Sequence, residues 1–128
     1  AELEVGSYVC LPHHSTAADR LGQLQIVESY LMKQFAYFIE QMKEAQVFDH
    51  TAVVLGSGMG NGSSHSNRNL PVILAGGGMN HQGHLVCPVE DHKRVPLSNL
   101  WLSTLQWFGV EADRFGKSTG TFSPMNLV

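Results

Sequence analysis

Residues 51–78 read TAVVLGSGMGNGSSHSNRNLPVILAGGG, and this stretch decides the predicted fold. It consists of two short apolar runs, 51–55 and 70–75, on either side of a loop rich in Gly, Ser and Asn (56–69). Uncharged apolar runs of this length are typical of strands buried on both faces of a parallel sheet. Open α/β sheets carry ligands beyond the carboxyl ends of their strands. The loop is therefore the predicted location of a functional site.

The segments around this stretch predict an α/β arrangement. A strand over 5–11 precedes a long helix over 17–45, and a second helix covers 99–108. A strand–helix–strand order implies a right-handed crossover in a parallel sheet. Apolar residues recur at three- and four-residue steps in the long helix and predict its core face: Leu24, Val27, Leu31, Phe35, Phe38 and Met42. Residues 1–128 are expected to form a single α/β domain or the C-terminal part of a larger α/β domain.

Local signals predict where these elements begin and end. Thr16 and Ser98 are the expected N-caps of the two helices, and Gly109 is the expected C′ residue of the second. Residues 85–87 are expected to form a short edge strand that Pro88 ends.

Composition excludes several functional classes. The formal net charge is −3 with no basic stripe, so nucleic acid is not an expected partner. No apolar run approaches the roughly 18 residues of a membrane helix, and the first residues lack the pattern of a signal peptide. Cys10 and Cys87 are expected to be buried thiols; a disulfide between them is an option only in an exported protein.

Three apparent motifs fail on inspection. A dinucleotide loop starting at Gly56 needs glycine where Asn61 stands, and a strand rather than a helix follows it. Ser57 is not a nucleophile elbow, because that motif needs glycine two residues before and after the serine, where Leu55 and Met59 stand. Residues 116–119 resemble the end of a phosphate-binding loop, but Glu111 occupies the position of its first glycine.

The seven histidines include three candidates for metal ligands. His13 and His14 follow the first predicted strand, and His65 lies on the loop that follows the next. Because the ends of parallel neighbours lie together, His65 and one of the other two are expected to meet. The alternative is a polar loop held by its own side-chain to backbone hydrogen bonds. The remaining histidines are expected to be exposed loop residues: His50, His81, His84 and His92.

Several short motifs together carry a resemblance to a known family. They are His13-His14, FDHT at 48–51, GSGMGNG at 56–62, His65-Ser66, NLP at 69–71, LAGG at 74–77, PLSNL at 96–100, FGV at 108–110 and FGKSTG at 115–120. The chain resembles the C-terminal part of a bacterial family of uncharacterised exported proteins, a domain of unknown function related to the alkaline phosphatase/sulfatase superfamily. The resemblance implies a three-layer α/β sandwich with a mostly parallel sheet. It also implies export, and a nucleophile in an upstream part of the same chain.

The resemblance also implies a function and a set of site residues. His13 or His14 falls at the position of one metal-binding histidine of the superfamily, and His65 at another; Gly58-Met59 stands where an Asp-His pair is usual. The expected function is metal-dependent hydrolysis of a phosphate or sulfate ester, with Zn²⁺, Ca²⁺ or Mg²⁺ as cofactor. The alternative is a non-catalytic relative that binds a polyanionic ligand or a cell-surface partner. The residues expected to contact the small anionic ligand are Ser57, Asn61, Ser64 and Asn67.

Overall fold

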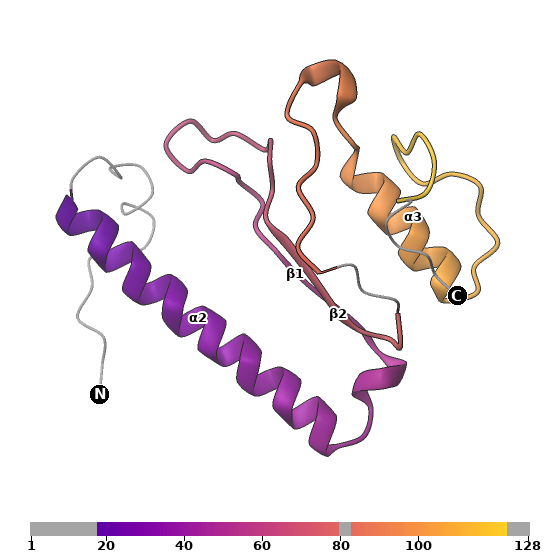
Figure 1. Ribbon diagram of the computed structural model, residues 1–128, viewed down its shortest axis with the longest axis horizontal. Coiled ribbons are helices and arrows are strands. Elements are labelled where there is room, and N and C mark those ends of the chain that lie inside the picture. Colours follow the sequence, from indigo (N-terminus) through magenta and orange to yellow (C-terminus); the bar gives the residue numbers. More distant parts are fainter. Residues whose placement is uncertain (1–17, 80–82, 123–128) are drawn as a thin grey trace. The chain divides into compact units, whose positions relative to one another are not determined.

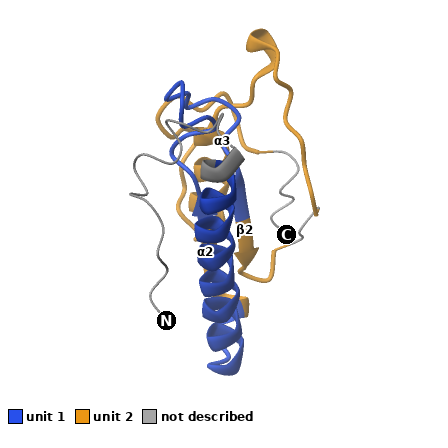
Figure 2. Cartoon of the chain, turned by 90° about the vertical axis from the view of Figure 1, so that its left-hand side faces the viewer, with its two compact units in different colours: residues 1–48, 55–73 blue, residues 49–54, 74–128 orange. Residues whose placement is uncertain are grey.

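The computed structural model describes residues 18–79 and 83–122 (Figure 1). Its elements in chain order are α2 (Ala18–Glu44), the 3-10 helix η1 (Phe48–His50), β1 (Ala52–Gly56), β2 (Val72–Gly76), the 3-10 helix η2 (Asp91–Lys93) and α3 (Leu97–Trp107). The chain divides into two compact units (Figure 2). One contains residues 1–48 and 55–73, and the other contains 49–54 and 74–128. The predicted strand 5–11 and the predicted cap Thr16 lie outside the described residues.

β1 and β2 pair with each other as an antiparallel hairpin. Beyond the ends of the two strands, the Ser57 N–H donates to the Pro71 carbonyl oxygen at 3.2 Å. The predicted α/β three-layer sandwich with a mostly parallel sheet is therefore wrong for the described structure. The physical reason is the connection: parallel neighbours need a crossover, usually a helix, whereas residues 57–71 simply fold back.

The long helix α2 has nearly the predicted bounds and ends in a left-handed residue. Gln46 has φ 58° and its N–H donates to the Lys43 carbonyl at 3.0 Å, while the Val47 N–H donates to the Met42 carbonyl at 3.1 Å. This pair of bonds is the Schellman arrangement, here built on Gln rather than Gly. The chain then turns through η1 into β1.

The predicted apolar face of α2 is covered only in part. Met42 is buried, and Leu24, Val27 and Phe35 are half-buried. In contrast, Leu31 and Phe38 remain about half exposed, at 50% and 49%. The helical period was predicted correctly, but the described residues do not bury the whole stripe.

The second helix, α3, starts two residues earlier than predicted. Its N-cap is Pro96, with no side-chain cap, so the prediction of Ser98 as the cap is wrong. Its end is confirmed: Gly109 has φ 80° and donates to the Gln106 carbonyl at 2.9 Å, and Val110 donates to the Leu105 carbonyl at 3.1 Å.

The C-terminal segment is fixed to α3 by buried polar side chains. The Thr119 N–H donates to Asn99 Oδ1 at 2.9 Å, and the Phe122 N–H donates to Ser103 Oγ at 2.8 Å. Both accepting side chains are buried, and Leu102 beside Ser103 is 1% exposed. Residues 116–119 are thus part of a structural segment rather than a phosphate-binding loop.

Trp107 ties α3 to the residue that follows β2. Its indole Nε1–H donates to the Gly77 carbonyl oxygen at 3.1 Å. Gly77 has φ 72°, and a Cβ there would lie 2.9 Å from Trp107 Cζ2. Glycine is required here both for the left-handed backbone and for the close approach of the indole.

Residues 85–87 form no strand in the structure, contrary to prediction. Cys87 is an exposed free thiol, so the expectation that it is buried is also wrong. None of the described helices combines the length and apolar content needed to cross a membrane.

Candidate functional site

The loop between β1 and β2, residues 57–71, is a second, smaller hairpin at its tip. Asn61 and Ser66 form an isolated antiparallel bridge, in which the Ser66 N–H donates to the Asn61 carbonyl at 3.1 Å. The Gly60 N–H donates to the Ser66 carbonyl at 2.8 Å. These bonds give the polar loop a defined course and hold residues 62–65 at its end.

Side-chain hydrogen bonds organise the same loop from within. Asn61 Oδ1 accepts from both the N–H and the hydroxyl of Ser64, at 3.0 and 3.1 Å. Ser57 Oγ donates to the Met59 carbonyl at 2.8 Å and accepts from the Met59 N–H at 3.2 Å. Bonds between a short polar side chain and the nearby backbone are the usual way in which Ser and Asn stabilise a turn.

The four predicted ligand-binding residues therefore differ in availability. The hydroxyls of Ser57 and Ser64 and the Oδ1 of Asn61 are engaged inside the loop. The amide nitrogen of Asn61 and the whole side chain of Asn67 form no hydrogen bond with the described residues. Both residues are exposed, so these two amides are the groups best placed to meet a ligand.

His65 lies at the end of the loop in a left-handed backbone conformation, with φ 50°. Its side chain is exposed. The left-handed backbone, which is uncommon for a residue other than glycine, belongs to the tight turn at 62–65. His13 and His14 lie outside the described residues, so the predicted meeting of these three histidines stays a prediction.

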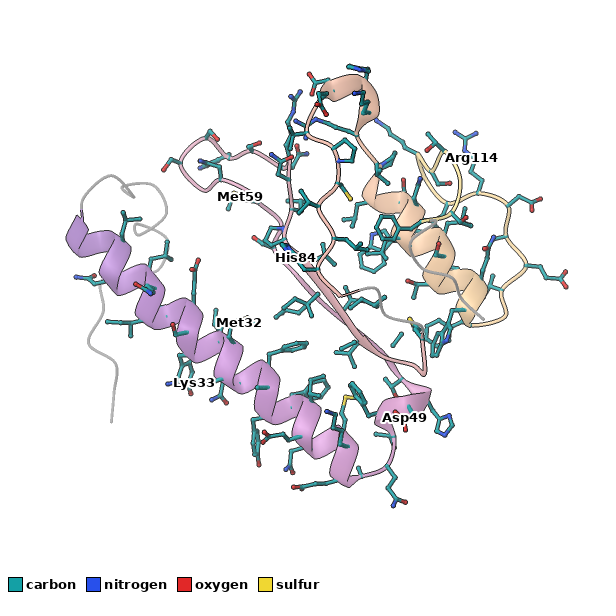
Figure 3. All side chains as sticks on the ribbon, viewed as in Figure 1. Met32, Lys33, Asp49, Met59, His84 and Arg114 are labelled. Carbon is teal, nitrogen blue, oxygen red and sulfur yellow. The ribbon has the colours of Figure 1, made fainter. Side chains whose placement is uncertain are left out.

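Over 18–79 and 83–122, no three side chains of His, Cys, Asp or Glu come together as metal ligands. Met59 is part of the loop (Figure 3) and is 43% exposed. Of the predicted ligands, only His65 is described, and one imidazole is not a metal site.

Arg68 is a candidate that the sequence prediction missed. The backbone N–H of Arg68 donates to Ser66 Oγ at 3.3 Å. This bond links Arg68 to the bridge at the loop tip. The signal was present in the charge pattern, because residues 50–89 contain no Asp or Glu and Arg68 is their only Lys or Arg. The whole chain has a net charge of −3, whereas residues 50–89 have a formal net charge of +1 from Arg68.

Comparisons with protein-family models, curated proteins and solved structures find no match to this chain.

Proposed function

We propose that the loop 57–71 binds an anionic ligand, namely the phosphate or sulfate group of an ester. The observation that carries this proposal is the combination of exposed amide donors and Arg68 on a stretch without a single carboxylate. The loop itself thus supplies amide donors and a guanidinium and carries no negatively charged side chain. Guanidinium groups present a planar fork of N–H donors that matches the oxygens of phosphate and sulfate.

Two donor groups complete the proposed binding surface. The amide nitrogens of Asn61, which is one of the two bridge residues, and of Asn67, which follows the other, supply neutral donors. The internal bonds of Ser57 and Ser64 fix the loop backbone, which lowers the entropic cost of binding. A small anionic ester is therefore the ligand class that this surface suits best.

Hydrolysis of the ester is a second proposal, supported by the family resemblance and by His65 on the same loop. A divalent metal ion bound by His65 with His13 or His14 would polarise the ester oxygen or activate a nucleophile. The described residues do not by themselves form that metal site. Export of the protein is proposed on the same resemblance.

Binding without catalysis is supported by a specific observation. Gly58 and Met59 offer neither a carboxylate nor an imidazole at the position where the superfamily has both. A non-catalytic relative would bind a polyanionic ligand or a cell-surface partner through the loop 57–71 without a bound metal ion. This is why ligand binding, rather than hydrolysis, is the primary proposal.

The test of binding is titration calorimetry of the chain with phenyl phosphate and phenyl sulfate, beside Arg68→Gln. We expect Arg68→Gln to weaken binding roughly tenfold, since it removes a charge-assisted hydrogen bond. Lys117→Gln, which removes a charge elsewhere in the chain, is the matched control and should bind like the parent. Equal affinities in Arg68→Gln and the parent would refute the proposed loop site.

Metal analysis separates the two proposals. Elemental mass spectrometry of the purified chain and of His65→Ala should show bound metal only in the former if the loop serves a hydrolase. Ester binding with no metal in either protein would support the non-catalytic reading and argue against hydrolysis.

A further inference from the structure

The segment that leads into η2, residues 84–90, has an unusual symmetry. It reads His84-Leu85-Val86-Cys87-Pro88-Val89-Glu90. About Cys87, an apolar residue lies on each side at the first and second positions, and the third positions hold His84 and Glu90. If two copies of this segment lie antiparallel with their Cys87 residues opposite each other, each apolar residue faces an apolar residue. The donor His84 then faces the acceptor Glu90. We call it the symmetric segment.

No described strand pairs with the symmetric segment. It runs as an extended stretch into η2 (Figure 1) and has no helix or strand assignment. Within the part of the chain that the structure describes, residues 84–89 form no hydrogen bond. Their side chains are all exposed, and Val86 is 80% exposed. An extended apolar segment with unpaired N–H and C=O groups is a template for strand pairing.

We propose that this segment pairs with the same segment of a second copy of the chain, antiparallel and centred on Cys87. The pairs across the two strands are then Leu85 with Val89, Val86 with Pro88, and Cys87 with itself. At each end His84 lies opposite Glu90 of the second copy, as donor and acceptor. The proposal is independent of anion binding by the loop 57–71.

Pro88 selects one hydrogen-bonding register. Residues directly opposite in an antiparallel pair alternate between hydrogen-bonded and non-hydrogen-bonded pairs. If Cys87 is a hydrogen-bonded pair, Leu85 and Val89 form the next ones, and the nitrogen of Pro88 points away from the partner. The other register would need an N–H that proline lacks. The sequence is therefore compatible with only the first register.

The end residues favour a second copy over another strand edge. Among the described residues β1 and β2 pair only with each other, and Ala52–Gly56 and Val72–Gly76 contain no charged residue and no histidine. These strands therefore have no donor side chain that could pair with the Glu90 carboxylate. Self-pairing places His84 opposite Glu90 at both ends, and opposite charges or donor–acceptor pairs directly across two strands are favourable. The contact is small compared with the about 1,200 Å² of a stable complex, so the association is weak.

The test is thiol cross-linking of the full chain in a Cys10→Ser background with a short bismaleimide. Self-pairing places the two Cys87 thiols side by side, so a dimer should form with a yield that rises with protein concentration. His84→Glu places two carboxylates opposite each other at both ends and should lower the yield about tenfold. The exchange variant His84→Glu with Glu90→His should restore it.

Proline variants test the register. Leu85→Pro removes an N–H that points to the partner and should abolish cross-linking, whereas Val86→Pro removes an outward N–H and should retain it. Circular dichroism confirms that each variant is folded, which these exposed positions should permit. Failure of the exchange variant to restore the yield, or equal loss in both proline variants, would overturn the proposal. Cross-linking that survives His84→Glu would show that the two Cys87 thiols meet without the proposed end pairs, and would also overturn the proposal.

Discussion

Gly60 shows what one residue contributes to the candidate site. A Cβ at this position would collide with the Arg68 carbonyl oxygen and lie 3.0 Å from the Asn69 carbonyl oxygen. The absence of a side chain therefore lets the two sides of the loop approach each other. Gly58 in the same loop has open space where a Cβ would stand. The sequence predicted a glycine-rich loop, but it could not distinguish these two glycines, because the difference depends on the opposite side of the hairpin.

Gly60→Ala is expected to lower the free energy of unfolding by about 1–3 kcal/mol, because the added methyl forces the loop sides apart. It should also weaken ester binding, since Arg68 is attached to the displaced backbone. Denaturant unfolding and calorimetry would measure the two effects. Gly58→Ala is the matched control, with an expected change within about 0.5 kcal/mol. A Gly60→Ala protein as stable as the control would contradict the close approach.

The predicted site residues stay a prediction, and the structure shows only which of their groups form hydrogen bonds within the loop. The loop was identified from its composition, and Ser57 and Asn61 do lie on it, but their oxygens bond within the loop. Sequence reveals that a side chain can donate or accept, whereas the partner it uses depends on the turn. Arg68 was not among the predicted residues, because arginine does not ligate metals and only the charge pattern of residues 50–89 distinguishes it.

Among the elements, helices were predicted well and strand pairing was not. The bounds of α2 and α3 follow from periodicity and from end signals such as Gly109, which are local properties of the chain. The two apolar runs were also located nearly correctly. Their pairing was wrong because a short apolar run has the same composition in a parallel and an antiparallel sheet. The hairpin bridge between Asn61 and Ser66, which decides the matter, has no strong sequence signature.

The partly covered face of α2 predicts unequal costs for two similar substitutions. Met42→Ala should lower the free energy of unfolding by about 2–3 kcal/mol, because its side chain is buried. Leu31→Ala, at a half-exposed position of the same stripe, should cost under about 1 kcal/mol. Denaturant melts of both variants would test this difference. If Leu31→Ala proved as costly as Met42→Ala, α2 would be covered by more than the described residues.

At the scale of the whole molecule, few apolar side chains are removed from water. Among those that the structure describes, only Met42, Val53, Leu100 and Leu102 are buried. Many large apolar side chains remain exposed, including Tyr37 at 58% and Phe108 at 63%. Hydrophobic burial is the main favourable term in folding, so the 128-residue chain studied alone should be marginally stable.

The isolated chain should therefore bind the dye ANS strongly and unfold over a broad temperature range. Exposed apolar surface binds ANS, and a small buried core gives a low unfolding enthalpy. Dye fluorescence and scanning calorimetry would measure these properties. A sharp transition with an enthalpy near the usual value of about 0.7 kcal/mol per residue, together with weak dye binding, would show a better-formed core.

The loop of the hairpin contains a site at which the chain can be cut between its two strands. Arg68 is exposed on the loop, and no other Lys or Arg occurs between residues 44 and 92. Trypsin cleaves after such residues, and exposed loops are its preferred targets. A cut at this bond would yield fragments 1–68 and 69–128, each carrying one strand of the β1–β2 pair. A two-stranded pair is marginally stable by itself, so the fragments would stay together only while the packing around the hairpin holds, and their separation after the cut would measure how strongly the two strands associate.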